Sequence, residues 1–126
     1  MTRGVTLDAG ALIALDRDDR RIVVMLARAQ ETSARVTIPA AALAQAVRNP
    51  ARQARLARLL RQPATDVVAL GRVDAIGVGR LLAASGTADV VDAHVVLCAR
   101  RTGQAVATSD PDHLRHLDPT LTLVAV

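Results

Sequence analysis

The chain has 126 residues and 51% of them are hydrophobic, so we expect residues 1–126 to form a single domain with one packed core. There is no Phe, Tyr or Trp, which excludes the aromatic stacking surfaces that many single-strand-binding and RNA-recognition proteins use. The formal net charge is +4, and every basic residue is an arginine. The absence of lysine excludes a phosphate-binding P-loop and a Schiff-base enzyme, whereas the positive balance permits a nucleic-acid partner.

The sequence carries no signal for a membrane or for an oxidising compartment. Its single cysteine, Cys98, has no intramolecular partner and lies in an apolar run, so we expect a buried side chain. No uninterrupted apolar run approaches the ~18 residues of a membrane span, and the first residues do not resemble a signal peptide. We therefore expect a cytoplasmic protein without membrane association.

Short apolar runs rich in β-branched residues alternate with stretches of helical periodicity along the chain. In chain order, the first half predicts strand 5–7, helix 11–15, a helix capped by residue 18 or 19 and reaching 29, strand 35–38, helix 40–48 and, after an Asn-Pro break, helix 50–61. The second half predicts strand 66–70, helix 73–84, helix 88–100, strand 104–108, helix 111–117 and strand 121–126. This alternation predicts an α/β fold with a parallel sheet of about four to five strands flanked by helices. In such sheets the functional site lies beyond the carboxyl ends of the strands.

Acidic side chains follow two of the predicted strands. Asp8 comes directly after the first strand, and Asp110 after the fourth, with Asp112 two residues later. Asp89 and Asp92 are spaced i, i+3 near the start of a predicted helix. If the first and fourth strands are neighbours, Asp8 and Asp110 converge at one edge of the sheet.

Several carboxylates in one place repel each other, and a divalent cation relieves that repulsion. Mg²⁺ and Mn²⁺ prefer oxygen ligands and commonly pair a few carboxylates with substrate phosphate, which favours attack of water on a phosphodiester. Helix capping is the alternative role for Asp89 and Asp110. Asp8 and Asp92 fit capping less well, because each lies in an apolar stretch.

Three segments together resemble a known family. Residues 7–15 read LDAGALIAL, residues 89–96 read DVVDAHVV, and residues 108–112 read TSDPD. In this order, and over nearly the whole chain, they resemble the acidic motifs of PIN-domain ribonucleases, and in particular VapC toxins of type II toxin–antitoxin pairs.

The resemblance implies a Mg²⁺- or Mn²⁺-dependent endoribonuclease that forms a homodimer and is inhibited by a cognate antitoxin, whose tail would occupy the site. It implies that Asp8, Asp92 and Asp110 are catalytic, metal-binding carboxylates. Asp89 and Asp112 are candidates for further metal contacts, direct or through water, and Ser109 for holding a water or a phosphate.

The chain departs from the family at one position. The helix after the second strand usually carries an acidic residue, whereas residues 39–48 read PAAALAQAVR and place Gln45 there. An amide offers an oxygen but no negative charge, so the number of metals, one or two, stays open. Asp89 or Asp112 would be the compensating ligand.

Arginines gather in an acid-free stretch of the first half. Arg48, Arg52 and Arg55 begin a run that Arg58 and Arg61 continue, and arginine binds phosphate in a bidentate fashion. The run is a candidate surface for RNA or for an acidic partner segment, with an ordinary solvated helix face as the alternative. The histidines, His94, His113 and His116, are expected to have structural or surface roles, since no third ligand supports a zinc site.

Two other functions stay open at this stage. In the first alternative, the chain is a catalytically degenerate PIN-like module that binds RNA or a protein without cleavage, and Gln45 marks a lost site. In the second alternative, Asp8 belongs to a small phosphohydrolase or phosphoacceptor domain. Two observations argue against it: Gly10 occupies the position where a second acidic residue would be expected, and the chain has no lysine.

Overall fold

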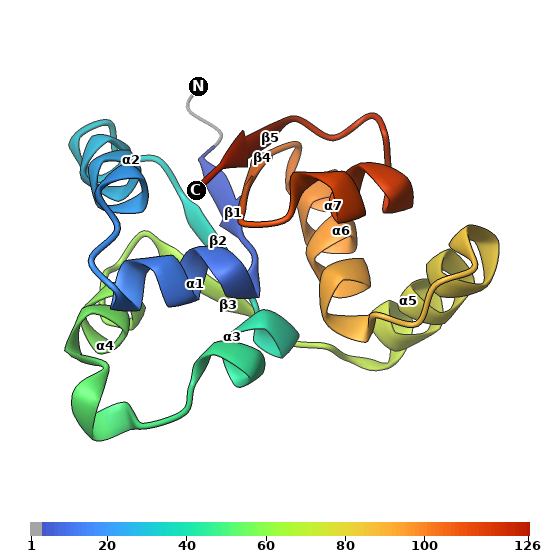
Figure 1. Ribbon diagram of the computed structural model, residues 1–126, viewed down its shortest axis with the longest axis horizontal. Coiled ribbons are helices and arrows are strands. Elements are labelled where there is room, and N and C mark those ends of the chain that lie inside the picture. Colours follow the sequence, from blue (N-terminus) through green and yellow to red (C-terminus); the bar gives the residue numbers. More distant parts are fainter. Residues whose placement is uncertain (1–3) are drawn as a thin grey trace.

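The computed structural model describes residues 4–126 and confirms the predicted parallel α/β fold (Figure 1). Its sheet has five strands in the order β3-β2-β1-β4-β5, and every neighbouring pair is parallel. The strands are β1 (Val5–Leu7), β2 (Val36–Pro39), β3 (Thr65–Val68), β4 (Ala105–Thr108) and β5 (Leu123–Ala125).

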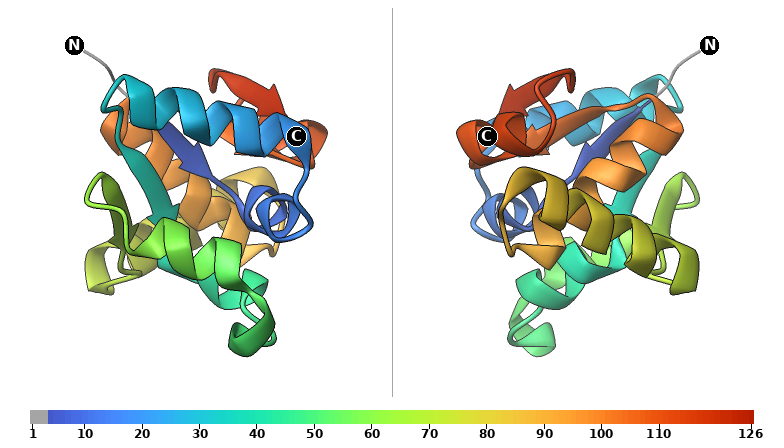
Figure 2. Two further views of the ribbon diagram at one scale, coloured as in Figure 1. Left: turned by 90° about the vertical axis from the view of Figure 1, so that its left-hand side faces the viewer. Right: turned by 90° about the vertical axis from the view of Figure 1, so that its right-hand side faces the viewer.

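Helices cover both faces of the sheet (Figure 2). They are α1 (Ala9–Asp16), α2 (Arg20–Glu31), α3 (Ala40–Ala46), α4 (Ala54–Leu60), α5 (Arg72–Ser85), α6 (Val90–Thr102) and α7 (Pro111–Leu117). The side views place α2 and α4 on one face and α6 on the other, with α5 packed outside α6. The site described below therefore opens at an end of the sheet rather than through a face.

The strand order reverses at β1, because the chain builds β2 and β3 on one side of it and β4 and β5 on the other. Val5 and Leu7 of β1 pair in register with Ala105 and Ala107 of β4. The first and fourth strands are thus neighbours, which is the condition under which Asp8 and Asp110 converge. Ligand sites of open parallel sheets lie at such a switch point, in the crevice beyond the carboxyl ends of the strands.

The core is aliphatic, as expected for a chain without aromatic residues. Leu7, Leu12, Ile38 and Val106 are each 0% exposed and join the sheet to α1 and α6. Cys98 is 1% exposed, and burial raises the pKa of its thiol to about 11, so it acts as a small hydrophobic residue.

The predicted continuous helix over residues 50–61 is wrong. A 3₁₀ turn over Pro50–Arg52 ends at Gln53, and α4 begins after it. The Gln53 side chain is buried, and its Oε1 accepts the backbone N–H groups of Arg48 and Asn49 at 3.0 and 3.2 Å while its Nε2 donates to the Ala46 carbonyl. This local network satisfies backbone groups of the segment between α3 and the 3₁₀ turn, and Asn49 makes no side-chain cap hydrogen bond.

Other boundaries differ from the predictions by one or a few residues, and helix α5 continues through its glycines. A Cβ at Gly77 would lie 3.0 Å from Leu97 Cδ1, so this glycine lets α5 approach α6 closely.

No single helix among residues 4–126 is long and apolar enough to cross a membrane. The pair α5 and α6 passes the same test on length and composition but is bent by 109°. Residues 1–3, on which the comparison with a signal peptide partly rests, lie outside the described range.

Candidate functional site

Asp8 leaves β1 and caps helix α1. Its Oδ1 accepts the Ala11 N–H at 2.7 Å, and its backbone N–H donates to the Ala107 carbonyl of β4 at 3.2 Å. The expectation that Asp8 fits capping poorly is therefore wrong: it caps the helix although it lies between apolar residues. Capping uses Oδ1 and holds the carboxylate at the start of α1, directly after β1.

Asp8 is only 4% exposed, and the pKa of its carboxyl group is perturbed. Burial raises the pKa above its ordinary value, and the nearby charge of Asp92 raises it further. Hydrogen bonds from the Thr108 hydroxyl and from the backbone of Ala11 and Ser109 partly oppose this. A buried carboxylate with a raised pKa at a switch point is typical of a functional site.

The start of α6 supplies two more carboxylates. Asp89 caps the helix, its Oδ1 accepting the Asp92 N–H at 3.0 Å, and Asp92 lies in the first turn. The pKa of Asp92 is raised, first by burial and then by the charges of Asp89 and Asp110, while a hydrogen bond to His113 opposes the rise. Asp92 thus lies close enough to Asp8, Asp89 and Asp110 for its charge to interact with each of theirs.

The end of β4 places the last carboxylate. The Asp110 N–H donates to Thr108 Oγ1 at 2.9 Å, and its Oδ1 accepts the His113 N–H at 3.3 Å as the cap of α7. The Thr108 hydroxyl therefore contacts both Asp8 and the loop that carries Asp110. Ser109, between them, is exposed.

Carboxylates of Asp8, Asp89, Asp92 and Asp110 therefore meet where β1 and β4 end and α1, α6 and α7 begin. Ligand atoms of Asp89, Asp92 and His113 lie within 4.8 Å of one another. An oxygen-rich group in which neighbouring charges raise the pKa of Asp8 and Asp92 fits a hard divalent cation, because the cation removes the repulsion that burial aggravates.

Gly10, in the first turn of α1, lets the β4–α7 loop approach Asp8. A Cβ at this position would lie 1.7 Å from Ser109 Oγ, 2.6 Å from Ser109 Cβ and 3.4 Å from Asp8 Oδ1. A side chain here would therefore displace Ser109 from the site.

We expect Gly10→Ala to lower the free energy of unfolding by about 1–3 kcal/mol, because the new methyl group overlaps Ser109. The double variant Gly10→Ala/Ser109→Gly removes the clashing atoms and should regain most of that loss in urea denaturation. Gly79→Ala is the control, since a Cβ there meets nothing within 4 Å. A Gly10→Ala protein as stable as the wild type would contradict the close approach.

Two predicted residues make no hydrogen bond or ion pair with the carboxylate group within residues 4–126. The Asp112 side chain is 95% exposed and forms an ion pair with Arg115 at 2.9 Å. Gln45 is exposed on α3, and no hydrogen bond within residues 4–126 joins its amide to the carboxylates. The metal role of both residues stays a prediction.

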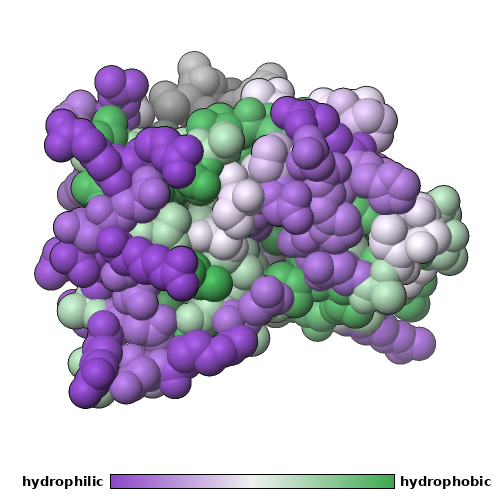
Figure 3. Space-filling model, viewed as in Figure 1, coloured by the Kyte–Doolittle hydropathy of each residue, from purple (hydrophilic) through white to green (hydrophobic). Residues whose placement is uncertain are grey.

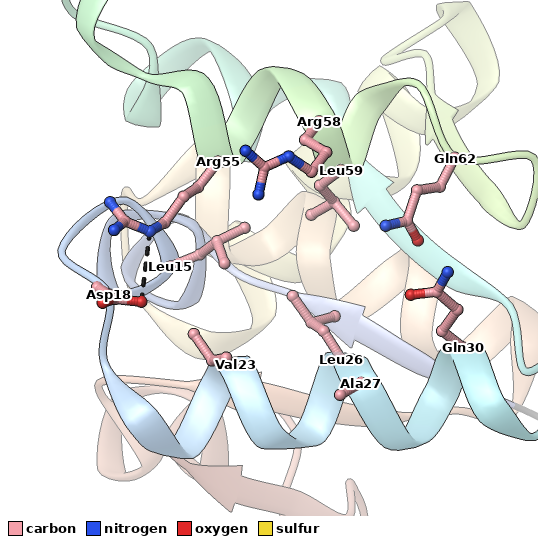
Figure 4. A pocket seen from close by; sticks show the side chains of 10 residues that line it. All are labelled: Leu15, Asp18, Val23, Leu26, Ala27, Gln30, Arg55, Arg58, Leu59 and Gln62. Atoms are coloured by element: carbon pink, nitrogen blue, oxygen red, sulfur yellow. Dashed lines mark ion pairs between the residues drawn. The ribbon is translucent and has the colours of Figure 1, made fainter.

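The predicted arginine surface lies on and beside α4 rather than at the carboxylates. The Arg48 guanidinium donates to the Ala44 and Val47 carbonyls, Arg52 is exposed, and Arg55 pairs with Asp18 at 3.3 Å. Arg55 lines a groove between α2 and α4, whose floor is apolar (Figure 4). The lining residues are Leu15, Asp18, Val23, Leu26, Ala27, Gln30, Arg55, Arg58, Leu59 and Gln62.

Sequence reasoning missed His113. Its Nδ1 lies 2.5 Å from Asp92 Oδ2, inside the carboxylate group. The available signal was its place three residues after Asp110, in the first turn of a helix that Asp110 caps. His94, by contrast, is a core residue that is 0% exposed, as a structural role predicts, and burial lowers the pKa of its ring.

Comparison with known proteins agrees with this geometry. The profile of the PIN domain family matches residues 5–118. A structural relative is VapBC2 from Rickettsia felis, described as bound to a DNA fragment from its promoter, with a TM-score of 0.67, 14% identity, and coverage of 97% of this chain and 98% of that chain. Among curated proteins none matches. At this identity the relative supports the fold, and the family profile covers nearly the entire chain, including all the carboxylates of the site; the chain belongs to the PIN domain family.

Proposed function

We propose that this protein is a metal-dependent endoribonuclease of the VapC toxin type, cleaving cellular RNA in the cytoplasm and neutralised by a cognate antitoxin. The observation that carries the proposal is the group of coupled carboxylates at the switch point between β1 and β4. Membership of the PIN domain family supports a nuclease, and the VapBC2 relative supports a toxin with an antitoxin partner.

In this proposal Asp8, Asp92 and Asp110 hold Mg²⁺ or Mn²⁺, with Asp89 close by. When bound, such a cation lowers the pKa of a coordinated water and neutralises charge on the phosphodiester oxygens. The chain orients the carboxylates: Thr108 and the backbone of Ala11 and Ser109 donate to Asp8, which fixes its direction. In the same proposal the exposed Ser109 hydroxyl holds a phosphate or a water.

The substrate contacts proposed here are electrostatic. The chain has no aromatic side chain for stacking on a base, so affinity for RNA must come from arginines and backbone donors. Arg48 and Arg52, both exposed, are the proposed phosphate contacts. Arg55 is already paired with Asp18 and would have to exchange that partner.

The groove between α2 and α4 is the surface we assign to the antitoxin. Leu15, Val23, Leu26 and Leu59 give it an apolar floor, and hydrophilic side chains crowd the α2 and α4 side of the molecule (Figure 3). Arginines at its rim favour a segment that presents both apolar and acidic side chains. The expectation that the antitoxin tail also reaches the carboxylates stays part of the proposal.

A homodimer is also proposed. The first two turns of α5 expose Val73 and Ile76 at 81% and 51%, and the start of α6 exposes Val90 at 45%. Hydrophobic side chains gather over this side of the molecule in Figure 3. A second copy of the chain would remove them from water.

A second function is favoured by one observation, the neutral Gln45 on α3 where the family usually has an acid. In this second function the chain binds RNA or a protein without cleaving it. Such a module need not bind a divalent cation.

The test is cleavage of total cellular RNA by the purified, partner-free chain with Mg²⁺, with Mn²⁺ and with EDTA. Discrete fragments that require the metal support the ribonuclease. Intact RNA in the presence of a folded protein that binds Mn²⁺ in calorimetry would favour the binding module, and Gln45→Glu would then be tested for gain of cleavage.

A further inference from the structure

His113 is held against the carboxylate group from two sides. Its ring Nδ1 lies 2.5 Å from Asp92 Oδ2, and its backbone N–H donates to Asp110 Oδ1 at 3.3 Å. Its side chain is 27% exposed and that of Asp92 is 18% exposed, so water reaches the pair from one side. The helix start that positions Asp110 therefore also positions an imidazole inside the site.

The ring nitrogen also lies where it could bind a metal ion together with neighbouring carboxylates. Ligand atoms of His113, Asp89 and Asp92 lie within 4.8 Å of one another, a span that one cation can bridge. Without a metal, Nδ1 shares a hydrogen bond with Asp92 Oδ2. A cation in that place would bind the lone pair of this nitrogen instead.

Nitrogen in the donor set changes which cation is preferred. Mg²⁺ is a hard ion that keeps oxygen ligands and water, whereas imidazole nitrogen suits first-row transition metals. We propose that His113 is a direct nitrogen ligand, which makes this site select Mn²⁺ or a similar transition-metal ion over Mg²⁺. This inference rests on the proposed function only in taking the carboxylate group as a metal site.

The histidine three residues later provides a matched control. His116 is on the same helix, is exposed, and its Nε2 lies 3.2 Å from the Ser85 carbonyl, away from the carboxylates. Replacing it with Asn changes the same residue type in the same helix without removing a proposed ligand.

The experiment is pulsed electron paramagnetic resonance of Mn²⁺ bound to the whole chain, together with calorimetric titration of Mn²⁺ and Mg²⁺. We expect a hyperfine coupling to a histidine ¹⁴N in the wild type and in His116→Asn, and its loss in His113→Asn. Asn keeps an amide donor for Asp92 but removes the ring nitrogen. Mn²⁺ affinity should fall about tenfold or more in His113→Asn, with a smaller change for Mg²⁺.

The absence of a ¹⁴N coupling in the wild type would overturn the inference. So would an equal loss of both affinities in His113→Asn, because that result means His113 only orients Asp92. Melting of the metal-free variants confirms that each is folded. A nitrogen coupling without RNA cleavage would contradict the ribonuclease and leave the ligand assignment standing, so the two failures are distinguishable.

Discussion

Replacing Asp8 with Asn should lower RNA cleavage by about three orders of magnitude or more, the equivalent of ~4 kcal/mol of transition-state stabilisation. Asn retains an oxygen that can accept the Ala11 N–H and is itself a good helix cap, so α1 should form normally. The charge that would hold the cation is lost. The measurement is the rate of fragment formation from total RNA under saturating metal.

The same variant should be at least as stable as the wild type without metal. Burial and the charge of Asp92 both raise the pKa of Asp8, so its ionised form is disfavoured in the folded protein, and a neutral amide removes that penalty. Asp66→Asn is the control: Asp66 is exposed near the amino ends of β2 and β3, paired with Arg35 at 2.6 Å, and its loss should leave cleavage unchanged. Undiminished cleavage by a folded Asp8→Asn protein would remove Asp8 from the mechanism.

Divalent cations should stabilise the wild-type fold. A ligand that binds only the folded state at 100 times its dissociation constant adds about 2.7 kcal/mol. For a domain of this size the melting temperature should rise by roughly 10 °C. Asp92→Asn should lose most of this rise, because Asp92 is coupled to Asp8, Asp89 and Asp110.

The sign of the pH dependence follows from the raised pKa values of Asp8 and Asp92. The folded metal-free protein binds these protons more tightly than the unfolded chain, so their contribution to stability is full below the ordinary value of 3.8 and is lost as pH rises through the raised pKa. Metal should therefore stabilise more at neutral than at acidic pH, where protons compete. Melting curves with Mn²⁺ and with EDTA, at about pH 7.5 and about pH 5, measure this. An equal rise in wild type and Asp92→Asn would place the bound metal elsewhere.

Much of this fold could be predicted locally. The short apolar runs that become β1 and β4, and the helical periodicity of α2 and α6, are set by neighbours within a few residues. The stretch around Gln53 could not be predicted this way. Its side chain bonds to backbone groups of Ala46 and Arg48, and a buried amide in that role depends on tertiary packing.

The candidate site also has a part that could be predicted from the sequence and a part that could not. The acidic positions Asp8, Asp89, Asp92 and Asp110 were visible because each stands at a strand end or a helix start. Whether Gln45 and Asp112 join them was not, because side-chain direction and the competing ion pair with Arg115 belong to the folded surface. The sequence predicted a structural or surface role for His113, since spacing alone does not reveal its contact with Asp92, 21 residues away.

By itself the sequence determined the α/β class, the aliphatic core and the positions of the carboxylates in the chain, because periodicity, capping and composition act over short distances. Only the tertiary structure decided that β1 lies beside β4, that Gly10 admits Ser109 next to Asp8, and that His113 contacts Asp92. Those juxtapositions join residues far apart in the chain, and the packing of α1, α6 and α7 around the switch point of the sheet brings them together.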